Sequence, residues 1–148
     1  MDSSLNITSE SINLNKYLLD NKDSLDLVLI NLEKLSNKSK SFFKNLLTKD
    51  DRIDNHLLEI NQFQTHGYAW FETYRIGLRE TLNWFVRLEK NNEAKEIDAS
   101  ITLFAFAEYL TQISNGIMMS QSEIVRPKDL GLSLIHISEP TRPIDISY

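Results

Sequence analysis

The chain has 148 residues, of which 41% are hydrophobic and 25% are charged, and its formal net charge is −5. This length is sufficient for one domain with its own hydrophobic core. A mildly acidic chain with charges of both signs lacks the basic footprint of a nucleic-acid-binding protein. The sequence contains no cysteine, which excludes a disulfide framework and thiolate chemistry.

The N-terminus gives no secretory signal, because MDSS is not followed by a basic region and an apolar run. No apolar stretch approaches the roughly 20 residues that a membrane-spanning helix needs. We therefore expect a cytoplasmic protein that binds neither a membrane nor nucleic acid.

The end of the chain, residues 132–148, reads LSLIHISEPTRPIDISY. Leu132 to Arg142 is similar, residue for residue, to the translation of a transposase adapter used to prepare sequencing libraries. Residues 143–145 fall where that adapter has a variable index, and the last three residues match the constant sequence after it. We expect this tail to be non-native and extended, and the natural protein to continue past Gly131, so the tail is excluded from the fold argument. The alternative is a native polar tail.

Proline usage permits long helices, because two of the three prolines lie in this tail and none precedes Pro127. Residues 1–22 are rich in Ser and Asn and are expected to fray, with one short helix possible around residues 14–18. Asp23 is a candidate N-cap for a first main helix from about Ser24 to Thr48. Its apolar stripe has helical spacing: Leu25, Val28, Leu29, Leu32, Leu35, Phe42, Phe43, Leu46 and Leu47.

A second helix is predicted from about Asp51 to Lys90, after a polar turn. Its length favours a kink near Gly67. Gly67 and Gly77 each cost about 1 kcal/mol in a helix interior relative to alanine, so we expect close approach of another helix there. The apolar and aromatic positions predict a buried face: Ile53, Leu57, Ile60, Phe63, Trp70, Phe71, Tyr74, Leu78, Leu82, Phe85 and Leu88.

A third helix is predicted from about Glu96 to Asn115, where Asn115-Gly116 supplies a stop. The predicted buried positions are Ile101, Phe104, Ala107, Leu110 and Ile113, with Leu103 as a further candidate. Together, residues 23–116 are expected to form an all-α, up-down bundle of three main helices. Residues 117–131 are expected to be a linker, with one short turn at the capping-box pattern SQSE of residues 120–123.

Candidate site residues are few. His66 lies one helical turn before Trp70, but no second histidine or cysteine stands at metal-ligand spacing, so a hydrogen-bonded structural histidine is favoured over a base or ligand. His56 is the other histidine before the tail. Glu108 lies in an apolar run and could be a base of raised pKa. A rim carboxylate paired with an arginine (Arg75, Arg79 or Arg87) is favoured. We predict no catalytic, cofactor-binding or metal-ligating residue.

Four clusters between Gln64 and Gly131 carry a resemblance to a known family. They are His66-Gly67-x-Ala69-Trp70, Thr73-Tyr74 with Leu78-Arg79, Glu108-Tyr109-Leu110 with Gln112, and Gly116-Ile117 followed by Met119-Ser120-Gln121-x-Glu123-Ile124-Val125-Arg126-Pro127. This stretch resembles the N-terminal helical extension of methylsuccinyl-CoA dehydrogenases, a branch of the acyl-CoA dehydrogenase family. The chain departs from the pattern at Met118, where proline is expected, and at Ser122, where glycine is expected.

The resemblance implies a parent flavoenzyme that oxidises a branched dicarboxylic acyl-CoA at its α and β carbons. FAD would accept the hydride, a carboxylate would remove the α proton, and an electron-transfer flavoprotein would take the electrons. The family implies a homo-oligomer, and it places flavin, base and substrate pocket in a dehydrogenase core, here expected past Gly131. This chain would then be an inactive helical domain that packs on that core or on a neighbouring subunit. The alternative is a stand-alone helical protein-interaction module.

Overall fold

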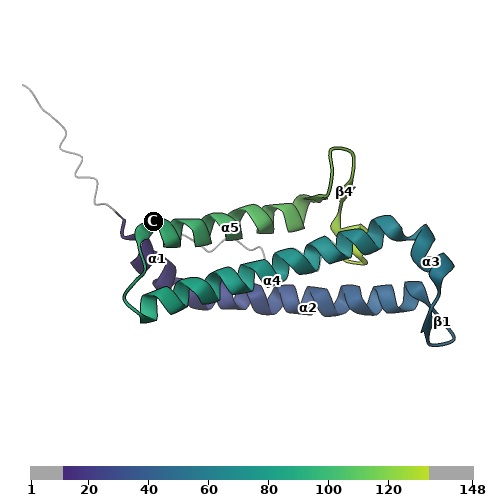
Figure 1. The fold of residues 1–148 in the computed structure, drawn as a ribbon, viewed down its shortest axis with the longest axis horizontal. Coiled ribbons are helices and arrows are strands. Elements are labelled where there is room, and N and C mark those ends of the chain that lie inside the picture. Colours follow the sequence, from purple (N-terminus) through teal and green to yellow (C-terminus); the bar gives the residue numbers. More distant parts are fainter. Residues whose placement is uncertain (1–11, 134–148) are drawn as a thin grey trace, which may run out of the picture.

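The computed structural model describes residues 12–133 and is dominated by helices (Figure 1). The all-α prediction is confirmed: the strands among the described residues form only two short antiparallel hairpins. None of the helices in this range is long and apolar enough to cross a membrane. The elements are α1 (Leu14–Asp20), α2 (Lys22–Leu47), β1 (Thr48–Lys49), β2 (Arg52–Ile53), α3 (Asn55–Ile60), α4 (Gln62–Lys90), α5 (Glu96–Asn115), β3 (Ile117–Met118), β4 (Ile124–Val125) and the 3-10 helix η1 (Pro127–Leu130).

Helix α4 is the centre of the bundle, because it packs against α2 on one side and against α5 on the other. Helices α2, α4 and α5 run along the long axis, and each runs in the opposite direction to the one before it (Figure 1). The face of α4 toward the core is a stripe of large side chains, and Phe71, Leu78 and Phe85 are completely buried. Helix α2 meets this stripe with leucines at three- and four-residue spacing: Leu25, Leu29, Leu32 and Leu35. The faces that α2 and α4 turn toward each other are therefore the faces that the apolar spacing of their residues predicts.

The short N-terminal helix that the sequence allowed around residues 14–18 is present as α1, within the segment that we expected to fray. Leu18 of α1 is completely buried, and α1 packs against α5. The Asn13 side chain caps the helix by accepting a hydrogen bond from the backbone of Lys16 at 3.0 Å. Burial of Leu18 and this cap explain why so short a helix is ordered. Residues 1–11 of the expected frayed segment lie outside the described part of the chain.

The chain breaks its second helical segment at Asn61, whereas we expected a kink near Gly67. Asn61 ends α3 with a non-helical ψ of 23°. Its side-chain amide donates to the carbonyl of Leu57 at 2.7 Å, a local bond that competes with the helical ladder. Helix α4 then continues through Gly67 as a single element of 29 residues.

The phase predicted for α5 is wrong. Phe104 is 77% exposed and Ile101 is 49% exposed, and Ala107 is also exposed. Ile113 is buried as predicted, but the other buried positions are Ala99, Thr102 and Phe106. Because α5 is apolar around most of its circumference, its sequence spacing does not distinguish the face toward α4 from the face toward water.

Residues 117–131, expected as a linker, fold back onto the bundle as the β3–β4 hairpin and η1. Ile117, Val125 and Leu130 are buried, and η1 packs against α2, α4 and α5. The SQSE pattern shapes the hairpin loop, where the Glu123 amide donates to Ser120 Oγ at 3.2 Å. Leu132, assigned to the tail, is also buried, and its amide donates to the Pro127 carbonyl at 3.0 Å. Residues 134–148 of the expected tail lie outside the described residues.

Candidate interaction surface

A row of aromatic side chains follows the side of α4 that lies next to α5. His66, Trp70 and Tyr74 are spaced four residues apart, so they stand one above another on the helix. Trp70 Nε1 donates to His66 Nε2 at 3.1 Å, and the Trp70 ring meets the Tyr74 ring edge-on with centroids 6.0 Å apart. Tyr74 then stacks on Tyr109 of α5 at 4.4 Å. This aromatic row therefore joins α4 to α5.

The row continues into a short polar chain on α5. Tyr74 donates its hydroxyl hydrogen to Gln112 Oε1 at 2.8 Å, and Gln112 Nε2 donates to Glu108 Oε1 at 2.6 Å. Burial raises the pKa of Tyr74, and the neighbouring Tyr109 and Glu108 raise it further. The phenol is therefore held neutral as a donor.

Glu108 does not have the partner that we favoured for it. Its side chain is exposed and is bonded to Gln112. Arg75 and Arg79 instead bind Glu33 of α2, Arg79 Nη2 lying 3.0 Å from Glu33 Oε2. These ion pairs fasten α2 to α4. They leave Glu108 available to a partner outside the described chain.

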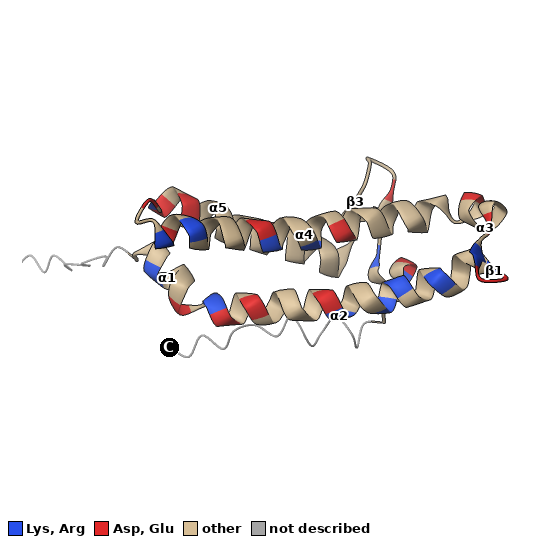
Figure 2. Ribbon diagram, turned by 60° about the horizontal axis from the view of Figure 1, so that its bottom comes forward, with Lys and Arg blue, Asp and Glu red and all other residues tan. Residues whose placement is uncertain are grey.

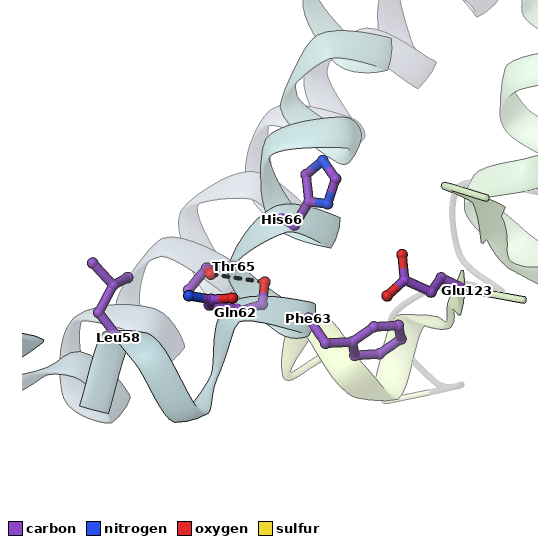
Figure 3. Close-up of a pocket in the computed structure, with 6 residues that line it drawn as sticks. All are labelled: Leu58, Gln62, Phe63, Thr65, His66 and Glu123. Carbon is purple, nitrogen blue, oxygen red and sulfur yellow. Dashed lines mark hydrogen bonds between the residues drawn. The ribbon is translucent and has the colours of Figure 1, made fainter. Parts of the chain in front are cut away.

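Two open hollows border the aromatic row and share His66. The larger has a volume of 540 Å³ and lies between the start of α4 and the β3–β4 hairpin (Figure 3). Figure 3 shows the His66 imidazole and the Glu123 carboxylate on opposite sides of it. The smaller hollow, of 270 Å³, extends along α4. The lining residues are Leu58, Gln62, Phe63, Thr65, His66 and Glu123 in the first, and His66, Ala69, Trp70 and Thr73 in the second.

The polar side chains that line these hollows form hydrogen bonds within the chain. Because His66 Nε2 accepts the Trp70 hydrogen, Nδ1 carries the proton of a neutral imidazole and is a donor. Thr65 Oγ is engaged with the Gln62 carbonyl at 3.0 Å. Among residues 12–133, no group of three or more His, Cys, Asp or Glu side chains could hold a metal ion. His56, the other candidate histidine, is exposed, and its backbone amide donates to Asp54, the N-cap of α3.

The second feature of this half of the molecule is the outer face of α5. Ile97, Ile101 and Phe104 are 60%, 49% and 77% exposed. No charged residue occurs from Ala99 to Ala107. Charged residues occur along α2 and, in α4, from Glu72 onward, whereas the middle of α5 carries none (Figure 2). Exposed apolar side chains on one helix face are a feature that interaction sites share.

The described residues define a class of protein: a small helical bundle with a polar-aromatic row and an exposed apolar face on α5. No protein-family model matches the chain. Over 111 residues it is 39% identical to (2S)-methylsuccinyl-CoA dehydrogenase from Cereibacter sphaeroides. The match covers 75% of this chain but only 20% of that relative. The chain is therefore related to an acyl-CoA dehydrogenase, and it spans about a fifth of the relative's length.

The residues that carried the family resemblance meet in this region of the structure. His66, Trp70 and Tyr74 form the aromatic row, Glu108 and Gln112 form the polar chain, and Glu123 lines the larger hollow. Sequence reasoning assigned no site to them. The four-residue spacing of His66, Trp70 and Tyr74 indicated that they share one face of α4. The contact of this face with α5 could not be predicted, because the sequence did not define which face of α5 is turned toward α4.

Proposed function

We propose that this chain is a helical domain of a larger FAD-dependent acyl-CoA dehydrogenase, in which it has an architectural role. The observation that carries the proposal is the 39% identity over three quarters of this chain, set against 20% of the relative. A segment that accounts for so small a part of an enzyme, and that folds as a bundle around its own core, is typical of an added domain.

In this proposal the chemistry belongs to the rest of the parent enzyme. The parent oxidises a branched dicarboxylic acyl-CoA such as methylsuccinyl-CoA, with FAD as hydride acceptor and an electron-transfer flavoprotein as electron acceptor. It works as a homo-oligomer in the cytoplasm. The character of the two hollows supports this division of roles. They are open, and their ionisable groups are His66 and Glu123, whereas a flavin requires groups directed at both its ring and its pyrophosphate.

The first test is the source DNA that follows the codon for Gly131. We expect an open reading frame that continues into a dehydrogenase, followed by a full-length protein that purifies with FAD and oxidises methylsuccinyl-CoA. A native stop codon near Gly131 would instead support a stand-alone helical interaction module.

The second test is a flavin titration of the 148-residue chain beside the full-length protein. The chain is expected to remain colourless and inactive while the full-length protein is yellow. Flavin bound by the chain alone would overturn the architectural role. An activity that is unchanged, with the same oligomeric size and melting temperature, after removal of residues 12–131 from the full-length protein would also overturn it.

A further inference from the structure

We propose that the outer face of α5, formed by Ile97, Ile101 and Phe104 and bordered by Glu108, is the surface against which the dehydrogenase core of the same polypeptide packs. This inference rests on the proposed function, because it takes the core to be the part of the parent that follows Gly131. It identifies the docking element and the chemistry of the partner surface.

The first argument is that α5 is built to be covered on two sides. Its inner face fills the core with Ala99, Thr102 and Phe106, and its outer face exposes the apolar side chains of the proposed surface. A helix that is hydrophobic all round is normally buried all round. Helix α2 differs, because its exposed pair Leu27 and Ile30 lies between charged residues at helical spacing, Asp23 and Lys34.

The second argument is the place where the described chain leaves the bundle. The native chain is expected to run on from Gly131, the residue that ends η1. Pro127 and Lys128 of η1 line a hollow of 340 Å³ with Ser114 and Asn115, the last residues of α5. A domain that follows is therefore attached at the end of the bundle where α5 ends. In the relative, 80% of the length lies outside the match, since the match covers 20%. That is enough chain to cover the whole outer face of α5.

The third argument selects the attached core over a second copy of this chain. Stable interfaces between separate proteins bury about 800 Å² on each partner. Three apolar side chains on one helix form a smaller surface than that. A partner on the same polypeptide has a high effective concentration, so a small surface is sufficient to hold it.

The chemistry of the face defines what the core must present. Phe104 is the anchor, because it is the most exposed of the three side chains at 77%, and aromatic side chains seated in pockets dominate interface energetics. Glu108 follows one turn later, with Gln112 as a hydrogen-bond partner. The complementary surface is therefore an apolar pocket for Phe104 with a cationic or N–H donor opposite Glu108.

The test is hydroxyl-radical footprinting of the full-length protein and of the 148-residue chain. In the short chain, Phe104 and Leu27 are both expected to be oxidised readily. In the full-length protein, oxidation of Phe104 is expected to fall at least tenfold, while oxidation of Leu27 is unchanged. A dehydrogenase core that is present while Phe104 remains fully reactive would overturn this inference and leave the proposed function standing.

Two variants of the full-length protein supply an independent readout. Phe104→Asp is expected to release the helical domain and to speed proteolytic cleavage between this domain and the core, past residue 131, at least tenfold. Leu27→Asp, which places the same charge at an exposed apolar position on α2, is the matched control and is expected to leave the cleavage rate unchanged. Equal rates in both variants would contradict the docking role. So would protection of Phe104 in the 148-residue chain that appears only as the chain dimerises. Absence of a dehydrogenase core downstream would overturn both proposals.

Discussion

The Val125 side chain occupies the space that a Cβ atom on Gly67 would need. A Cβ built there would lie 2.3 Å from Val125 Cγ2, well inside van der Waals contact. Val125 is 1% exposed, so it has no free space to move into. The glycine thus lets strand β4, rather than another helix, lie directly on α4. Gly77 of the same helix has no neighbour within 4 Å of that position.

These two glycines should respond oppositely to alanine. Gly67→Ala is expected to destabilise the chain by about 1–3 kcal/mol, because overpacking must displace Val125. Gly77→Ala is expected to stabilise it by about 1 kcal/mol, because alanine is the better helix former and the site is open. Urea unfolding of both variants measures the difference. Stabilisation by both substitutions would show that β4 does not press on Gly67. Val125→Ala should relieve part of the Gly67→Ala cost.

The apolar spacing predicted the buried faces of α2 and of α4 from Phe63 onward, because each helix has a charged outer face. Ile53 and Ile60, also predicted to be buried, are 66% and 61% exposed, because they lie in β2 and α3 before α4 begins. In α2, even Ser39, which interrupts the apolar stripe, is completely buried at the position that the stripe assigns to it. The buried face of α5 could not be identified in this way, since apolar residues lie on both of its faces. The burial of Leu18 against α5 could not be predicted from the sequence either. A short helix is stabilised by contacts with residues far away in the sequence, and local spacing does not reveal these contacts.

Truncating one phenylalanine on α4 and one on α5 tests which face of each helix is buried. Phe71 is completely buried, so Phe71→Ala is expected to cost about 3–5 kcal/mol. Phe104→Ala in the same 148-residue chain is expected to cost less than about 0.5 kcal/mol, as for other surface substitutions. The two midpoints of denaturant unfolding provide the comparison. A Phe104→Ala cost similar to that of Phe71→Ala would restore the phase first predicted for α5.

Alkaline pH should weaken the contact between α4 and α5. The folded state raises the pKa of Tyr74 above its ordinary value of 10.0, chiefly by burial. A raised folded pKa means that the stabilisation is complete below pH 10 and is lost as the pH rises through the folded value. Tyr74→Phe is expected to reduce the fall in unfolding free energy above about pH 10. Tyr68, whose pKa is also raised mainly by burial, gives the comparison variant Tyr68→Phe. An alkaline slope that only Tyr68→Phe changes would show that Tyr74 does not contribute.

The short elements around the helices were harder to predict than the helices themselves. Asp50 and Asp51 adopt φ values of 51° and 57°, which allow a tight turn between β1 and β2. The sequence indicated a polar turn there but not the hairpin. The aromatic row was missed for a different reason. Trp70 and Tyr74 were predicted to be core side chains, but Trp70 is only partly buried and the neighbouring His66 is exposed. The row therefore lies at the surface where α4 meets α5.

Leu132 provides the last prediction, because it is the first residue of the expected tail and is nevertheless buried in the bundle. It is 4% exposed, and its amide bonds to Pro127. Just before it, Gly131 has a φ of 70° and lies against the Phe42 ring, where a Cβ would meet Phe42 Cγ at 2.4 Å. This turn directs Leu132 back onto the bundle.

Removing residues 134–148 is therefore expected to leave the melting temperature unchanged, in keeping with the adapter origin that we assign to the tail. Removing residues 132–148 is expected to lower the melting temperature, and Leu132→Ala to cost about 2 kcal/mol, because both expose core that Leu132 covers. Thermal unfolding of the two truncated chains decides the matter. Equal melting temperatures would mean that burial of Leu132 adds nothing to stability. A drop already present on removal of 134–148 would argue for a native tail.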